Sequence, residues 1–317
     1  MTTTALSETE TVTPLPTQIA HHNLNKRTAS GSVGRVVVWV TLIGGAIFSI
    51  VPMIWLIIAP SKTAPQLNND PPFSFGNIAN YGIAWQNLLT FQDGIIVQWL
   101  VNSVIYTLLI VAISCVTALL AGYALAATAI PFKRTMLITT LVAMIVPPVA
   151  LVLPLFIQIS QLGLYDTPTA VILTSSFYPF GVFLAYIYFT TSIPHEIYEA
   201  ARVDGAGEFK TFFLIALPLS RGLFGMLAFF SFSAAWVNYF LPYVLLGSAV
   251  NYTLPVGLGI LFSSTPALNP GNGAQQSVIG RPEIALAGLL VALPILVVFL
   301  LSSRLLVRGV LAGAVKS

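Results

Sequence analysis

Six runs of apolar residues without a charged side chain constrain the fold of this chain more than any other feature of its sequence. A helix needs about 20 residues to cross the hydrocarbon layer of a membrane, and each run is close to that length or longer. A β-barrel strand would instead alternate apolar and polar residues. The pattern predicts an all-α, polytopic membrane protein with six transmembrane helices, over residues 36–58, 99–127, 137–159, 169–189, 223–246 and 284–301.

The composition excludes the main soluble classes of protein. Hydrophobic residues make up 56% of the 317 residues and charged residues only 7%, which excludes a soluble enzyme and a disordered protein. The single cysteine, Cys115, lies within an apolar run and excludes a disulfide scaffold. Proton- and sodium-driven transporters usually carry ionisable groups inside their spans. The charge-free runs therefore favour a transport process powered from outside the membrane core.

The positions of the basic residues predict the orientation of the spans. Of the 13 Lys and Arg residues, all but Lys62 and Arg281 fall in the tails and loops on one side of the predicted bundle. Basic residues gather on the cytoplasmic side, so both termini are expected in the cytoplasm. Residues 1–34, with few large apolar residues, are expected to form a disordered cytoplasmic tail ahead of a transmembrane domain over 35–317. The long outer loops, 59–97 and 247–283, suit either a docking surface for an external partner or a solvated cap.

The most specific pattern lies in a loop on the basic side, residues 192–221, which we call the elbow. Pro194 suits the first turn of a helix, and Asp204-Gly205 is typical of a helix end. A second short helix is expected from Glu208. One face of the first helix would carry Ile193, Ile197, Ala200 and Ala201, and one face of the second Phe209, Phe212, Phe213 and Ala216. A surface gripped by a soluble partner and a hairpin that only closes the loop fit this pattern equally well.

The elbow contains a pattern that resembles the EAA signature loop in the membrane subunits of binding-protein-dependent ABC importers. That signature is Glu-Ala-Ala, three residues, Gly, nine residues, and Ile-x-Leu-Pro. All seven fixed positions are matched, by Glu199, Ala200, Ala201, Gly205, Ile215, Leu217 and Pro218. The variant Ala-Arg-Val-Asp-Gly-Ala-Gly, with Gly122-Tyr-Ala-Leu-Ala and Trp236-x-Asn238, is similar to the carbohydrate-uptake branch of maltose-type permeases. The likeness extends from about residue 36 to the end, and the long N-terminal extension departs from it.

The resemblance implies a fold and a set of partners. The implied fold is the type I ABC importer permease (MetI-like) architecture. The elbow would be the coupling helix, held in a cleft of an ATP-hydrolysing subunit, with Glu199 paired to a basic residue there, Gly205 giving the bend, and Arg202 and Asp204 in the same loop. The implied partners are a second homologous permease subunit, two ATP-binding subunits, an extracytoplasmic solute-binding protein and the lipid bilayer. The implied location is the bacterial cytoplasmic (inner) membrane, and no nucleic acid is expected.

The expected function is import of a sugar or oligosaccharide, driven by ATP hydrolysis in a partner subunit. The chain has no Gly-x-x-x-x-Gly-Lys-Ser/Thr pattern, so it is expected neither to bind ATP through a P-loop nor to act as an enzyme. No metal or cofactor is expected in the chain itself, since ATP and Mg would serve the partner. The alternatives are import of a non-sugar solute (glycerol phosphate, a polyol or a peptide), a secondary transporter, and a membrane-embedded enzyme or scaffold.

Uncharged polar and aromatic residues within the runs are candidates for lining a translocation path. Sugars suit aromatic faces and neutral hydrogen-bonding groups. For any single residue, helix packing is the favoured alternative, because such side chains also stabilise contacts between membrane helices. The candidates are Asn102, Ser103, Tyr106, Ser176, Tyr178, Ser233, Trp236, Asn238 and Tyr239. Pro147-Pro148 is expected to bend the third run.

Overall fold

The computed structural model describes residues 30–265, 268 and 279–314, and within them the side chains of residues 34–303. The chain divides into two compact units, residues 1–52 and 53–317. The first unit contains most of α1 (Ser30–Ile58), an apolar helix with Pro52 inside it. Of the predicted disordered tail (residues 1–34), residues 1–29 lie outside the described residues. Residues 30–34 belong to helix α1, which begins at Ser30, earlier than the predicted boundary at residue 35.

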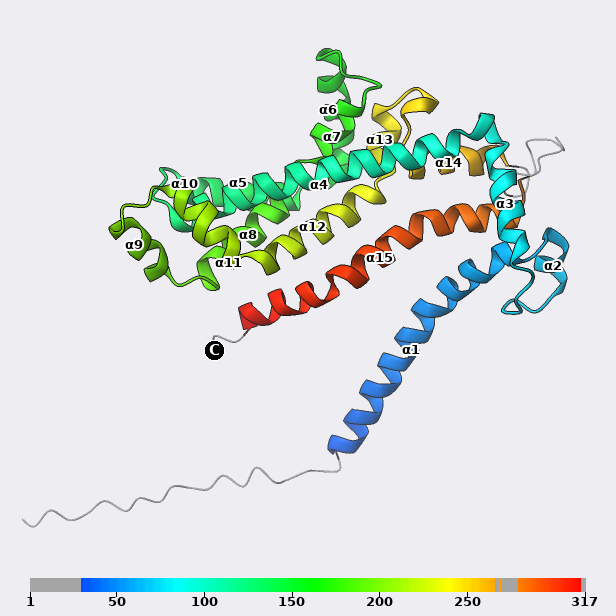
Figure 1. Cartoon of the computed structure of the whole chain (residues 1–317), viewed down its shortest axis with the longest axis horizontal. Coiled ribbons are helices and arrows are strands. Elements are labelled where there is room, and N and C mark those ends of the chain that lie inside the picture. The colour runs from blue at the N-terminus through cyan, green and yellow to red at the C-terminus, as the bar shows by residue number, and fades with distance from the viewer. Residues whose placement is uncertain (1–29, 266–267, 269–278, 315–317) are drawn as a thin grey trace, which may run out of the picture. The chain divides into compact units, whose positions relative to one another are not determined.

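The second unit is built from helices (Figure 1). Its first half contains η1 (Ala59–Ser61), α2 (Ala64–Asn69), α3 (Ala79–Leu89), η2 (Phe91–Gly94), α4 (Ile95–Ala127), α5 (Lys133–Ile145), α6 (Pro148–Gln161), α7 (Pro168–Ser175) and α8 (Pro179–Thr191). Its second half contains α9 (His195–Val203), α10 (Glu208–Thr211), the π-helical segment η3 (Phe212–Ala216), α11 (Leu217–Leu219), α12 (Arg221–Trp236), α13 (Phe240–Leu245), η4 (Ala249–Asn251), α14 (Leu254–Ser264) and α15 (Arg281–Ala314).

Three of the predicted spans are single continuous helices, namely α1, α4 and α15. By length and composition, the described part of the chain has four helices that could cross a membrane, or up to six if each of two bent helix pairs makes one span. The predicted bend in the third run is confirmed. There α5 and α6 meet at 103°, because Val146 and Pro147 each precede a proline and are extended.

The fourth and fifth runs are each interrupted, although Pro168–Thr191 still counts as one candidate span. The fourth run breaks between Ser175 and Pro179, since the residue before a proline is pushed out of the helical region. The fifth run ends as α12 at Trp236 and resumes in α13. Pro242 accounts for this break, because its ring would clash with the carbonyl four residues earlier in a continuous helix.

Helix α4 is the central packing element of the second unit. It contacts α8, α12 and α14, and α12 in turn contacts α15 (Figure 1). One buried cluster surrounds the C-terminal end of α4 and includes Tyr123, Phe189 and Tyr198. A second cluster surrounds its N-terminal end and includes Trp99 and Leu258. Each end of α4 is therefore fixed to a different set of helices. The outer loop 247–283 is also more structured than expected, because α14 packs on α4 within it.

The contact between α4 and α8 generates a test of this packing. A Cβ atom at Gly122 would lie 2.4 Å from the Ala185 Cβ and 2.9 Å from its carbonyl carbon. We expect Gly122→Ala to destabilise the protein by about 1–3 kcal/mol through overpacking. The matched control is Gly82→Ala in α3, where nothing lies within 4 Å and alanine should be neutral or stabilising. Thermal unfolding in detergent measures both, and equal midpoints for the two variants would contradict the close contact.

Candidate functional site

The elbow bends where the sequence predicts. Helix α9 ends at Val203, and Gly205 adopts a left-handed backbone with φ of +76°. The amide of Gly205 donates to the Arg202 carbonyl at 3.0 Å, and the amide of Ala206 donates to the Ala201 carbonyl at 2.9 Å. These two bonds form the Schellman arrangement that closes a helix with glycine. The bend is thus a defined turn that satisfies the last carbonyls of α9.

Most signature residues of the elbow lie on its surface. The exposed members are Glu199, Ala200, Arg202, Asp204, Gly205 and Pro218, while Ala201 is buried and Ile215 and Leu217 are half-buried. The predicted phenylalanine face is divided, because Phe212 and Ala216 are buried but Phe213 is exposed and Phe209 is 79% exposed. With Val203 at 88%, the bend presents large apolar side chains outward. Such a surface suits burial against another protein.

Tyr198 anchors α9, although the sequence analysis did not single it out. It is almost fully buried and its ring contacts Tyr123 at 5.9 Å between centroids. Burial raises the pKa of Tyr198 to about 12, so its ring stays neutral. Its position three residues before the buried Ala201 is the spacing that could have identified it.

The two charged groups expected to bind a partner differ in their surroundings. Glu199 is exposed, and its Oε1 lies 3.7 Å from the Nε2 of His195, one turn earlier. Arg202 is engaged within the chain, because its Nε donates to the Glu208 Oε1 at 3.1 Å. Of the two, Glu199 is the group more available to an incoming basic residue.

Three of the predicted path residues hold a loop against the N-terminal half of α4. The Asn102 Nδ2 donates to the Val250 and Tyr252 carbonyls at 2.7 and 3.0 Å. The Leu254 amide donates to the Ser103 Oγ at 2.6 Å, and the Tyr106 hydroxyl donates to the Asn251 carbonyl at 3.2 Å. These contacts favour the packing alternative for all three candidates.

The candidates in α12 and just after it are also divided. The Trp236 Nε1 donates to the Val291 carbonyl of α15 at 2.9 Å, which is a packing contact. Tyr239 is exposed and stacks on Tyr243, and Asn238 is half-buried. The Ser233 hydroxyl is buried and has no hydrogen-bond partner among the described residues. None of these residues lines the cavity described next.

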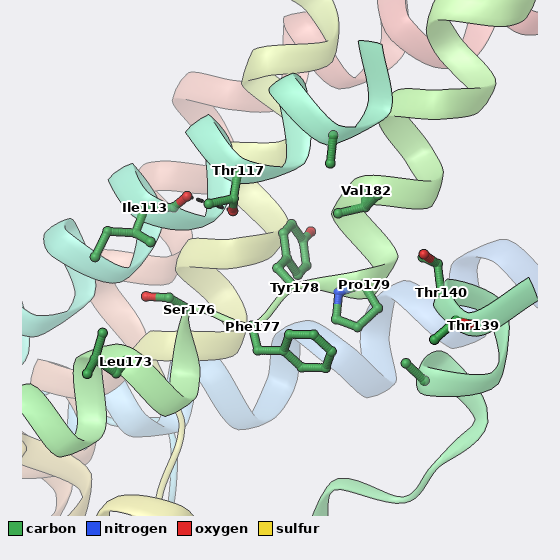
Figure 2. A pocket seen from close by; sticks show the side chains of 12 residues that line it. Ile113, Thr117, Thr139, Thr140, Leu173, Ser176, Phe177, Tyr178, Pro179 and Val182 are labelled. Carbon is green, nitrogen blue, oxygen red and sulfur yellow. Dashed lines mark hydrogen bonds between the residues drawn. The ribbon is translucent and has the colours of Figure 1, made fainter. Parts of the chain in front are cut away.

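Ser176 and Tyr178 do lie together, at a cavity of about 450 Å³ between α4, α5 and the α7–α8 break (Figure 2). The ring of Tyr178 packs on Gly181, where a Cβ would lie 2.2 Å from the ring. Irregular backbone at membrane depth is tolerated where protein or a water-filled cavity satisfies it. The Ser114 hydroxyl meets part of this need by donating to the Ser176 carbonyl at 3.2 Å.

The cavity wall is uncharged and mostly apolar, with a few hydroxyl groups. Thr117, Thr140 and Ser176 each donate their hydroxyl proton to a carbonyl one turn earlier, at 2.8, 2.9 and 2.6 Å. Their oxygens therefore remain free only to accept. No Asp, Glu, Lys, Arg or His among the described residues lines the cavity, and Phe177 adds an aromatic face (Figure 2). These few oxygens can accept protons from the hydroxyl groups of a neutral ligand. Elsewhere in the described residues, no three His, Cys, Asp or Glu side chains gather as metal ligands would.

Asp166 fastens the loop that the α4 side chains hold. It lies between α6 and α7, and its carboxylate accepts the amides of Gly247 and Ser248, both at 2.9 Å, as well as the Ser248 hydroxyl. The Asn251 Nδ2 donates to the Asp166 carbonyl at 2.7 Å. Burial opposes ionisation of this carboxylate, but the hydrogen bonds outweigh it and lower the pKa of Asp166 to about 2.

Comparison with known families gives one match over residues 118–312, to the family described as "Binding-protein-dependent transport system inner membrane component". Three curated proteins illustrate the similarity. The inner membrane ABC transporter permease protein YcjP of Escherichia coli is 34% identical over 222 residues, which cover 69% of this chain and 75% of that protein. The diacetylchitobiose uptake system permease protein NgcG of Streptomyces coelicolor is 29% identical over 76% of each chain. The arabinooligosaccharides transport system permease protein AraQ of Halalkalibacterium halodurans is 29% identical over 88% of this chain and 96% of its own length.

A solved structure shares the fold. It is a bacterial ABC transporter involved in the import of the acidic polysaccharide alginate, and its chain matches with a TM-score of 0.72. The match covers 87% of this chain and 98% of the other, at 20% sequence identity. At that identity the likeness concerns the arrangement of helices alone.

The low pKa of Asp166 generates a prediction on acid stability. Because folding lowers its pKa from 3.8 to about 2, the stabilisation is present above 3.8 and is lost as the pH falls through about 2. We expect Asp166→Asn to weaken the loop at neutral pH and to remove this part of the acid dependence. The control is Asp93→Asn, since Asp93 and Asp166 both have a positive φ. Thermal unfolding between about pH 2 and pH 6 measures the difference. An unchanged acid dependence in Asp166→Asn would contradict it.

Proposed function

We propose, because this chain belongs to the family of binding-protein-dependent transport system inner membrane components, that the solute it carries is a sugar or oligosaccharide. Members of this family are permease subunits of ABC importers, so the chain is a transport component and not an enzyme. It is proposed to lie in the bacterial cytoplasmic membrane. The cavity at the α7–α8 break carries the proposal on the solute, because its wall is neutral and accepts hydrogen bonds.

The wall of this cavity argues against the charged alternatives. A glycerol phosphate or a peptide would bring ionised groups to a wall with no countercharge, and an unpaired charge in such a setting is costly. A neutral polyol fits the wall as a sugar does, but the relatives named for diacetylchitobiose and arabinooligosaccharide uptake favour the sugar. Ser176 and Tyr178 are the residues that we propose to contact it. The other path candidates are proposed to support the helices around the path.

The proposed topology keeps the six spans predicted from the sequence, with the fifth beginning after the elbow and both termini in the cytoplasm. The basic residues support this orientation, because all but Lys62 and Arg281 lie on the side of the elbow. The elbow then faces the cytoplasm. The loop 247–254 at the other end of α4 faces outward, toward the proposed solute-binding protein.

The elbow is proposed to be the coupling element for an ATP-hydrolysing subunit. Its exposed bend, with Val203 and Phe209 outward and Glu199 at the surface, supports docking into a cleft of that subunit. A second permease subunit and two ATP-binding subunits complete the proposed assembly, and ATP with Mg is used only by the latter. Closure of the ATPase pair displaces the elbow and shifts the population toward an outward-open path.

Uptake by the reconstituted complex tests the proposal. The solute-binding protein of the complex is purified, and its ligand is identified. Import of that ligand into vesicles is then measured with intact and with disabled ATPase subunits. A sugar ligand and ATP-dependent uptake support the proposal. A ligand that is not a sugar would reject the sugar assignment. Uptake that persists with the disabled ATPase would identify a secondary transporter instead.

Variants at two neighbouring glycines distinguish a coupling role of the bend from a general sensitivity of this loop to substitution. Gly205 has φ of +76°, so Gly205→Ala is strained by about 1–2 kcal/mol, and Gly205→Pro also loses the amide that donates to Arg202. We expect both variants to insert normally but to hydrolyse ATP with reduced uptake. The matched control is Gly207→Ala, because Gly207 has an ordinary φ of −70° and no atom lies within 4 Å of the position that an added methyl group would take. Normal uptake by Gly205→Pro would contradict the lever role of the bend.

A further inference from the structure

Three side chains from separate elements meet at the C-terminal end of α4. Glu208, which opens α10, accepts from the Arg202 Nε at 3.1 Å through Oε1 and from the Tyr123 hydroxyl at 3.0 Å through Oε2. Arg202, at the end of α9, also donates to the Ala127 carbonyl. Both oxygens of one carboxylate are therefore engaged, and the network joins α4 to the two helices on either side of the bend. We call these three residues the clasp.

The geometry of the clasp should make it contribute more to stability than an isolated surface ion pair. The side chains of Arg202 and Glu208 are 37% and 46% exposed, so a lone pair between them would contribute little. Here the pair also bonds a tyrosine hydroxyl and a backbone carbonyl. Ala127 is the last residue of α4, where carbonyls lack partners within the helix and a cation is favoured by the helix dipole. Arg202 therefore caps α4 as well as pairing with Glu208.

The hydroxyl of Tyr123 is held in place by aromatic packing. Its ring contacts Phe212 at 5.2 Å, Phe189 at 5.8 Å and Tyr198 at 5.9 Å between centroids. Phe189 ends the preceding span, Tyr198 lies in α9, and Phe212 follows α10. The ring thus packs against segments before, within and after the bend, and it presents its hydroxyl to Glu208 in one orientation.

The opposite end of α4 is tied just as closely to the outer loop. The Trp99 Nε1 donates to the Ala249 carbonyl at 2.8 Å, and Asn102 and Ser103 bond Val250 and Leu254. Helix α4, which includes both these contacts and the clasp, runs unbroken for 33 residues, which is roughly 50 Å. The bent pairs α5–α6 and α10–α12 offer no such continuous connection.

We propose that Tyr123, Arg202 and Glu208 are positioning residues that fix the elbow to α4, so that a push on the elbow moves α4 and the loop 249–254 as one body. This inference rests on the proposed coupling role of the elbow. The EAA signature leaves position 208 unspecified, so the role of Glu208 is a property of this chain's own geometry. None of the three residues needs to touch the solute or the nucleotide to act in this way.

A double-mutant cycle in the complete transporter tests the clasp. Tyr123→Phe removes one hydroxyl and keeps the ring, and Glu208→Ala removes both acceptors. We expect each variant to assemble and hydrolyse ATP, but to consume about threefold to tenfold more ATP per solute imported. The double variant should be no worse than the more severe single variant, because both changes break one interaction. Tyr186→Phe is the control, since its hydroxyl has no hydrogen bond among the described residues.

A second measurement separates failure of the clasp from failure of the proposed function. Amide hydrogen exchange at residues 203–210 should quicken in Tyr123→Phe and Glu208→Ala but stay unchanged in Tyr186→Phe, whatever the solute is. Unchanged exchange in these two variants would overturn the clasp. So would a double variant whose increase in ATP consumed per solute imported equals the product of the two single increases. A wild-type complex that imports no sugar under ATP would overturn the proposed function, while quickened exchange in the variants would still support the clasp.

Discussion

Satisfaction of backbone polar groups in a medium without water is the constraint on which this structure depends. A membrane offers no partner to a free amide or carbonyl, so the apolar runs must form helices. The same constraint makes every break informative. The break before Pro179 is tolerated because Ser114 bonds the Ser176 carbonyl and because the segment borders a cavity. Proline thus sets where a helix is interrupted, and neighbouring polar side chains determine whether the freed backbone groups find hydrogen-bond partners.

The helices divide into two mechanical kinds as a result. Helix α4 is long and continuous, and buried groups fix both of its ends. The third run contains a bend of 103° between α5 and α6, and a bend of 80° separates the end of the elbow from α12, just before the fifth run. A continuous helix transmits displacement along its axis, whereas a bend allows adjacent segments to reorient. An alternating-access transporter requires both behaviours, and here they fall on different elements.

Much of this architecture could be predicted from the sequence. The positions of the apolar runs, the bend at Pro147-Pro148 and the turn at Gly205 follow from helix length, proline sterics and the freedom of glycine at positive φ. The family also followed from seven residues of the elbow, and the match over residues 118–312 confirms it. The breaks in the fourth and fifth runs also lie near prolines. They were not predicted, because the residues on both sides of each proline are uniformly hydrophobic and look like one continuous span.

The hydrogen-bond partners of the path candidates were harder to predict, for a physical reason. In a membrane helix, a serine, asparagine or tyrosine has the same sequence signature whether it bonds a neighbouring loop or a solute. Asn102 bonds Val250 and Trp236 bonds Val291, and both partners are backbone carbonyls that no side-chain pattern reveals. The clasp escaped prediction in the same way. Glu208 and Tyr123 are 85 positions apart, and only the fold brings them together.

The distribution of charge connects these observations. Among the described residues, ionised groups are absent from the wall of the cavity and are concentrated at the elbow, where Arg202 and Glu208 remain partly hydrated. In the proposed mechanism, the neutral wall takes up the sugar without a charged contact, and the charge-assisted bonds of the elbow hold the segment that receives the push of the ATPase. The proposed path and the proposed coupling contacts then lie on different parts of α4. An external energy source would therefore drive a path whose wall has no ionisable group among the described residues.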